Sequence, residues 1–135
     1  MSFRYLLDTD TCIYLTKTSS RSVAARLALE PADAAAISVI TLGEMRFGAE
    51  QSSQRLRAIA SLDLFATMIH VLPLQPEVSE AYGSIRAELK RQGRLIGANE
   101  LWIAAQALTL NLTLVTNNLR EFRRVSGLRV ENWAN

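Results

Sequence analysis

The 135-residue sequence predicts a single α/β domain, residues 1–135, with a short, mostly parallel sheet. Short apolar runs typical of buried strands alternate along the whole chain with amphipathic segments of helical length. No repeat, low-complexity segment or linker divides the sequence. A chain of this size can bury roughly two-thirds of its unfolded surface. One core is therefore expected to fold without a disulfide or a structural metal.

Short apolar runs mark the predicted strands, since each is too short for a buried helix. In chain order they are 3–7, 35–39, 69–72, 112–115 and 128–130. Pro73 stops the third strand, and the fifth is expected at the edge of the sheet. Trp133 follows the last strand, and its side chain is expected to be buried in the core although it lies near the C-terminus.

Amphipathic spacing and capping residues mark the predicted helices. In chain order they are 12–15, 23–29, 42–50, 54–66, 76–92, 98–108 and 119–124. Thr41 is predicted to cap the third, because Glu44 follows at the capping-box spacing. In the fourth, Leu56 and Leu62 are expected to face inward. Pro76 suits the first turn of the fifth.

Composition excludes several classes of function. With Cys12 as the only cysteine, the chain has no internal disulfide and no cysteine-rich zinc site. His70 is the only histidine, which excludes multi-histidine metal sites. No apolar stretch has the length of a signal peptide or a membrane span. We therefore expect a cytoplasmic protein that contacts no membrane.

Acidic and amide residues fall where the predicted strands end. They are Asp8, Glu44 and Glu100, with the polar stretch Thr116, Asn117 and Asn118. Because the carboxyl ends of parallel strands line one crevice, these side chains are expected to meet there. Carboxylates that close repel one another unless a cation lies between them. Donors that are all oxygen select Mg²⁺ or Mn²⁺.

Each of these residues also has an ordinary structural role open to it. Glu44 can be a capping-box acid, and Glu100 a favourable charge at a helix N-terminus. Asn117 and Asn118 are typical of a turn. Asp8 is harder to explain in this way, since a buried acid without a partner is costly. Together the residues predict a divalent-cation site.

Five motifs in order resemble those of the PIN-domain family, specifically its VapC-type toxins. They are Tyr5–Thr9, Ile40–Glu44, Ile96–Ala105, Leu114–Phe122 and Glu131–Trp133. The resemblance implies a three-layer α/β/α fold and a Mg²⁺- or Mn²⁺-dependent endoribonuclease. It implies inhibition by a VapB-type antitoxin that inserts a peptide arm into the active cleft, and a homodimer that joins it in a larger complex. The fourth motif is associated with cleavage of initiator tRNA in the anticodon stem-loop.

By this resemblance, Asp8 and Glu44 match the first two metal-binding acids of the family. Glu100 stands where the family usually has an aspartate, and Asn118 where many members carry a fourth acid. Thr116 matches a threonine that orients ligands or a water, with Asn117 as a supporting neighbour. The extra methylene of Glu100 displaces its carboxylate by about 1.5 Å. Since ~1 Å at a reacting centre can cost about a hundredfold in rate, we expect attenuated metal-assisted hydrolysis of RNA.

A formal net charge of +2 conceals a cationic region. Residues 86–129 hold eight basic and three acidic side chains. Arg94 and Arg120 are expected at the rim of the crevice, where they could bind RNA phosphates. The alternative for such charges is a solvated helix face.

Two other functions stay open. Asp8 and Asp10 after a strand resemble the signature of haloacid-dehalogenase-like phosphatases, although the acid pair expected after a later strand is absent from Thr116–Asn118. The other alternative is a catalytically weak, metal-poor cleft that binds RNA or a partner.

Overall fold

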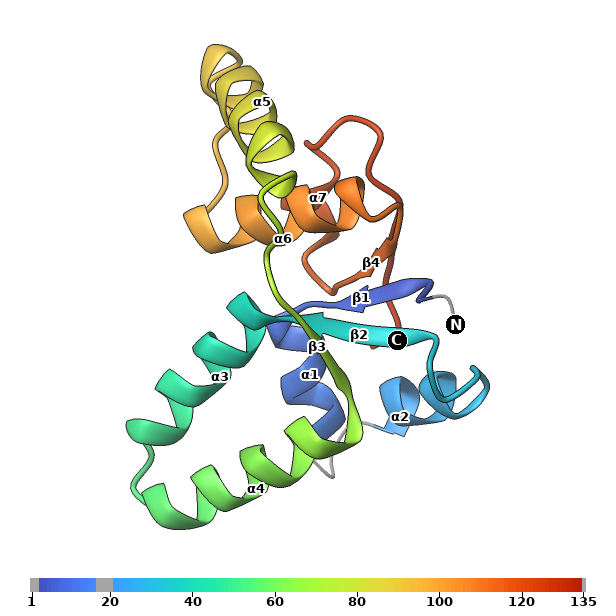
Figure 1. Cartoon of the computed structure of the whole chain (residues 1–135), viewed down its shortest axis with the longest axis vertical. Helices are drawn as coiled ribbons and strands as arrows, with labels where there is room; N and C mark the ends of the chain where they lie inside the picture. Colours follow the sequence, from blue (N-terminus) through green and yellow to red (C-terminus); the bar gives the residue numbers. More distant parts are fainter. Residues whose placement is uncertain (1–2, 17–20, 135) are drawn as a thin grey trace.

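The computed structural model describes residues 3–16 and 21–134, and its centre is one five-stranded sheet of order β3-β2-β1-β4-β5 (Figure 1). The strands are β1 (Tyr5–Leu7), β2 (Ala35–Ser38), β3 (His70–Leu72), β4 (Thr113–Val115) and β5 (Val130–Glu131). Every pairing is parallel. The predicted α/β fold is therefore confirmed, and its sheet is wholly parallel.

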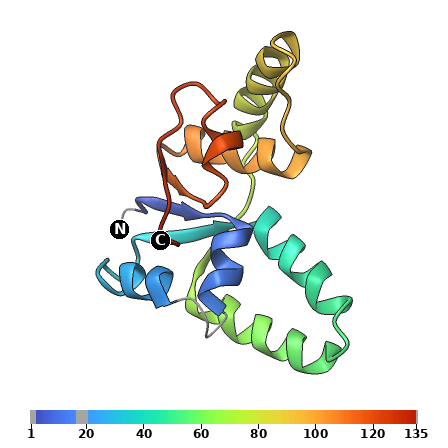
Figure 2. The ribbon, with the colours of Figure 1, turned by 180° about the vertical axis from the view of Figure 1, so that it is seen from behind.

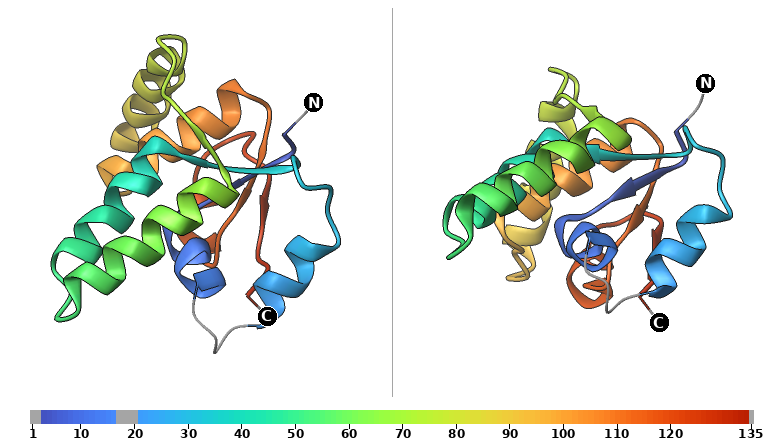
Figure 3. Two further views of the ribbon diagram at one scale, coloured as in Figure 1. Left: turned by 60° about the horizontal axis from the view of Figure 1, so that its bottom comes forward. Right: turned by 90° about the horizontal axis from the view of Figure 1, so that it is seen from below.

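Helices cover both sides of the sheet and complete three layers. They are α1 (Thr9–Thr16), α2 (Arg21–Ala28), α3 (Val39–Glu50), α4 (Arg55–Met68), α5 (Val78–Arg91), α6 (Ala98–Thr109) and α7 (Leu119–Phe122). Helices α5, α6 and α7 lie on one side, and α1 and α2 on the other (Figures 1 and 2). Helices α3 and α4 form a hairpin that extends away from the sheet (Figure 3). Among the described residues, no helix has the length and apolar character needed to cross a bilayer.

The sheet has one hydrophobic core on each face. Neighbouring residues of a strand belong to different cores, because successive side chains point to opposite faces. Leu6 and Leu114 belong to the core beneath α5, α6 and α7. Leu7 and Val115 belong to the core on the α1 and α2 side. Trp133 is buried in that second core, which confirms its expected position.

The start of α3 differs from the prediction. The N-cap is Ser38, whose hydroxyl accepts a hydrogen bond from the Ile40 N–H at 3.0 Å. Thr41 is therefore not the cap but a buried residue of the first turn. The strand runs directly into the helix at Ser38, so Glu44 lies in the second turn and has no capping-box role.

Helix α4 is less buried than its apolar spacing suggests. Leu62 is buried, as predicted, but Leu56 is 79% exposed. The prediction for Leu56 is wrong because it lies at the start of α4, near the tip of the hairpin, where the chain offers no core to cover it (Figure 3).

Candidate active site

A cavity of about 450 Å³ opens at the carboxyl ends of the central strands. Its lining comes from α1, α3, the start of α6 and the region after β4. It consists of Asp8, Thr9, Asp10, Glu44, Gly97, Ala98, Asn99, Glu100, Ile103, Asn118 and Phe122. Three predicted acids and the amide of Asn118 thus meet at one cavity, as the strand-end rule predicts.

Asp8 is the most deeply placed acid, with 5% of its surface exposed. Its Oδ1 accepts the Thr11 N–H at 2.9 Å, and the Thr116 hydroxyl also hydrogen-bonds to it. Burial raises the pKa of Asp8, and these bonds oppose the shift. Thr116 accepts the Asn118 N–H at 2.9 Å, so its hydroxyl hydrogen remains available for Asp8. Thr116 therefore links Asp8 to the turn after β4.

Glu44 projects from α3 and is held through both carboxylate oxygens. The Thr9 hydroxyl donates to Oε1. The Asn99 side-chain amide donates to Oε2 at 3.2 Å. One acid thus receives donors from the starts of both α1 and α6.

Glu100 combines a capping role with a place in the cavity. Its Oε1 accepts the Gly97 N–H at 3.0 Å, as an acid in the first turn of α6 can. Its Oε2 accepts the Asn118 amide at 3.0 Å. Burial raises the pKa of Glu100, and the charges of Glu121 and Glu44 add to the shift. The ordinary structural role and the site role therefore coexist in one side chain.

The three acids share the cavity without converging on one point. Within residues 3–16 and 21–134, no three His, Cys, Asp or Glu side chains are grouped closely enough to hold one ion. Glu100 is directed back toward the Gly97 N–H and the Asn118 amide.

The remaining predicted residues lie outside the lining. Asn117 is exposed and contributes nothing to the cavity wall. Arg94 and Arg120 are exposed near the loop before α6 and on α7, and their RNA contacts stay a prediction. The guanidinium of Arg124 donates to the Arg94 and Leu95 carbonyls at 3.3 and 3.2 Å. It therefore supports the backbone of the loop that leads to α6.

Sequence reasoning did not predict the roles of Thr9 and Asn99. Each directly adjoins a predicted acid, Asp8 or Glu100. That adjacency to a strand end or a helix start is the signal that could have identified them.

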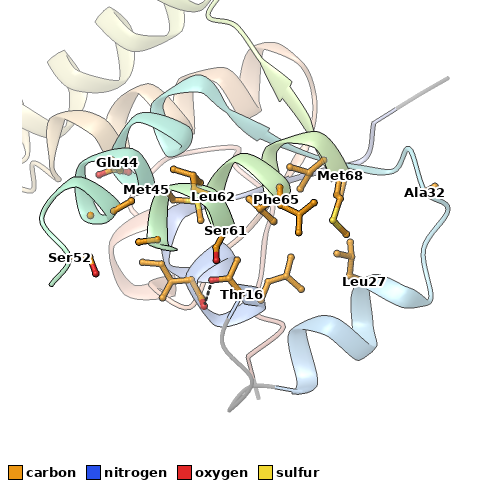
Figure 4. A pocket seen from close by; sticks show the side chains of 18 of the residues that line it. Thr16, Leu27, Ala32, Glu44, Met45, Ser52, Ser61, Leu62, Phe65 and Met68 are labelled. Carbon is orange, nitrogen blue, oxygen red and sulfur yellow. Dashed lines mark hydrogen bonds between the residues drawn. The ribbon is translucent and has the colours of Figure 1, made fainter. Parts of the chain in front are cut away.

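A larger, apolar cavity of about 880 Å³ lies between α1, α2 and the α3–α4 hairpin (Figure 4). Leu27, Met45, Phe65 and Met68 are among its lining residues (Figure 4). Glu44 lines this groove as well as the acidic cavity. The two cavities therefore share Glu44 as a lining residue.

The parallel sheet with acids at its carboxyl edge fits the predicted resemblance, and the chain belongs to the PIN domain family, whose profile matches residues 5–128. Ribonuclease VapC2 of Haemophilus influenzae is 42% identical over 130 residues, covering 96% of this chain and 98% of the relative. The tRNA(fMet)-specific endonuclease VapC of Shigella flexneri is 41% identical over 131 residues, covering 97% of this chain and 98% of the relative.

Solved structures agree with this assignment. The DNA-bound VapBC of Salmonella typhimurium superposes with a TM-score of 0.92 at 38% identity, covering 97% of this chain and 98% of that one. VapBC2 of Rickettsia felis, bound to a promoter DNA fragment, gives 0.91 at 35% identity, covering 97% and 99%. The resemblance to VapC-type proteins is confirmed. The phosphatase interpretation of Asp8 and Asp10 is left without support.

Proposed function

We propose that this chain is the endoribonuclease toxin of a toxin–antitoxin pair. The observation that carries the proposal is the single cavity where Asp8, Glu44 and Glu100 arrive from three different elements. Relatives about as long as this chain are named ribonucleases. The name of the Shigella relative supports tRNA(fMet) as the substrate, cut at an RNA phosphodiester.

The donor set fits Mg²⁺ or Mn²⁺, because Asp8, Glu44 and Glu100 offer only carboxylate oxygens. Burial raises the pKa of Asp8 and of Glu100, so a cation in the cavity would favour the charged form of both acids. These three residues would hold the ion after Glu100 turns inward. When bound, it would stabilise negative charge on the phosphate and the leaving oxygen.

The protein's own groups orient the site. Hydrogen bonds from Thr11 and Thr116 orient the Asp8 carboxylate. Asn118 holds Glu100 through its amide, and Arg94 and Arg120 are proposed to bind flanking RNA phosphates. The length of Glu100 is proposed to lower the rate, since its carboxylate reaches back to the Gly97 N–H.

A VapB-type antitoxin is the proposed partner, because the solved relatives are VapBC complexes. We place its apolar segment in the groove of about 880 Å³ between α1, α2, α3 and α4. That groove leads to Glu44, so a bound peptide arm would reach the acidic cavity. A homodimer within a larger complex with the antitoxin is part of this proposal.

The direct test incubates the protein with total bacterial RNA, with and without Mg²⁺, and maps the new ends. Asp8→Asn is the matched control, because it removes one charge while keeping shape. Cuts that need both the metal and Asp8 support the proposal, and cuts that need neither contradict it.

The second candidate is an RNA- or partner-binding module with weak metal affinity. The Glu100–Asn118 hydrogen bond favours it, since it occupies an oxygen otherwise available to a cation. Saturable RNA binding without new ends, together with no Mn²⁺ binding in a metal titration, would select this candidate.

A further inference from the structure

Glu44 is the only one of the three acids whose two oxygens are each held by a side chain from a different helix, within the described chain. Thr9 opens α1, and its hydroxyl donates to Oε1. Asn99 is the second residue of α6, and its amide donates to Oε2 at 3.2 Å. These donors lie 35 and 55 positions from Glu44 along the chain.

Glu44 needs such support because of where it stands. It belongs to α3, part of the hairpin that extends away from the sheet (Figure 3). It lines both the acidic cavity and the apolar groove. A glutamate has several rotatable bonds and loses much freedom when fixed in one place. Without its two donors, the carboxylate could turn toward either cavity.

The Thr9 hydroxyl and the Asn99 amide are suited to orienting the Glu44 carboxylate. A hydroxyl and an amide direct an oxygen without cancelling its charge, whereas a lysine or arginine would neutralise it. Neither of the two side chains that donate to Glu44 is cationic. Thr9 also lies 3.4 Å from the Thr41 hydroxyl of α3, which adds a second tie between α1 and that helix.

The Asn99 side chain has no competing contact among the described residues. Asn99 is exposed, and in the described part of the chain its amide makes one side-chain hydrogen bond, to Glu44. The contact with Glu44 is therefore the role that the structure shows for the Asn99 side chain.

We propose that Thr9 and Asn99 are positioning residues, which hold Glu44 in the acidic cavity at a fixed place relative to Asp8 and Glu100. Each adjoins one of those two acids in sequence, so the two hydrogen bonds tie all three together. The inference rests on the proposed function, since the arrangement matters only if the acids bind a metal ion.

The test compares Thr9→Val, Thr9→Ser and Asn99→Ala with the unchanged chain. Mn²⁺ affinity is measured by calorimetry, RNA cleavage gives kcat and KM, and thermal unfolding is followed without metal. Loss of a residue that orients a metal ligand typically costs 10–100-fold in metal affinity or activity. We expect at least a tenfold weaker Mn²⁺ affinity and a lower kcat for Thr9→Val and Asn99→Ala. KM and the unfolding temperature should stay unchanged, and Thr9→Ser should recover the loss.

Equal Mn²⁺ affinity in Asn99→Ala and the unchanged chain would overturn the proposal, as would an unchanged chain that binds no Mn²⁺. Asn99 is exposed, so its variant gives a result even if Thr9→Val does not fold. An unchanged chain that binds Mn²⁺ but cuts no RNA contradicts the proposed function alone. In that case the comparison of affinities still decides the positioning role.

Discussion

The Asn118 amide donates to Glu100 Oε2 at 3.0 Å, which joins the turn after β4 to the first turn of α6. Both residues stand at positions that the family resemblance assigns to acids. An amide here can hold Glu100, whereas a second carboxylate would repel it. Because the two side chains share a hydrogen bond, the effects of replacing them should not be additive.

Shortening Glu100 is expected to raise activity. Glu100→Asp retracts the carboxylate by about 1.5 Å, which should break its bond to the Gly97 N–H and bring it to the position usual for the family. We expect single-turnover RNA cleavage to rise by about tenfold or more, within the hundredfold range that ~1 Å can control. An equal or lower rate would show that the longer side chain is not what limits catalysis.

Asp8 is expected to reduce the stability of the fold at neutral pH. Burial raises its folded pKa above the ordinary 3.8, so folding loses free energy as pH rises from about 3.8 through the raised value. Asp8→Asn should therefore increase the unfolding temperature by a few degrees at pH 7. The gain should vanish below pH 3.8, where both states carry the protonated acid.

The same variant provides a test of metal linkage. A ligand that binds only the folded state stabilises it, so Mn²⁺ should raise the unfolding temperature of the unchanged chain but not that of Asp8→Asn. Equal stabilisation of both proteins would place the ion away from Asp8.

Arg94 and Arg120 are expected to bind RNA phosphates. The double variant Arg94→Gln, Arg120→Gln should bind RNA more weakly, and the slope of log affinity against log salt should fall by about two. Arg57→Gln is the matched control, since Arg57 is also exposed but lies on α4. Because the control removes one charge and the double variant two, a loss of log affinity in the control about half that of the double variant would indicate a general charge effect.

The apolar groove offers a matched pair of leucines for testing antitoxin binding. Leu64 and Leu56 both lie on α4 and are 63% and 79% exposed, but only Leu64 lines the groove. Leu64→Glu should weaken the affinity for the cognate VapB-type antitoxin by about tenfold or more, and Leu56→Glu should leave it nearly unchanged. Titration calorimetry measures both. A greater loss for Leu56→Glu would move the partner to the tip of the hairpin.

Strand positions and the meeting of Asp8, Glu44 and Glu100 could be predicted because both follow from local patterns and parallel topology. The start of α3 could not be predicted, because Ser38 is both the last residue of β2 and the N-cap of α3. Leu56 shows another limit, because helical spacing does not reveal whether anything covers a face. Contacts such as Thr9 with Glu44 depend on how two helix starts approach each other in space.

The position of Glu44 between two cavities has an evolutionary consequence. A partner bound in the apolar groove would contact the same residue whose carboxylate belongs to the acidic cavity. A substitution of Glu44 that prevents antitoxin binding would then also lower the proposed ribonuclease activity. Escape mutants should therefore be found elsewhere along the groove, among residues that serve the inhibitor alone.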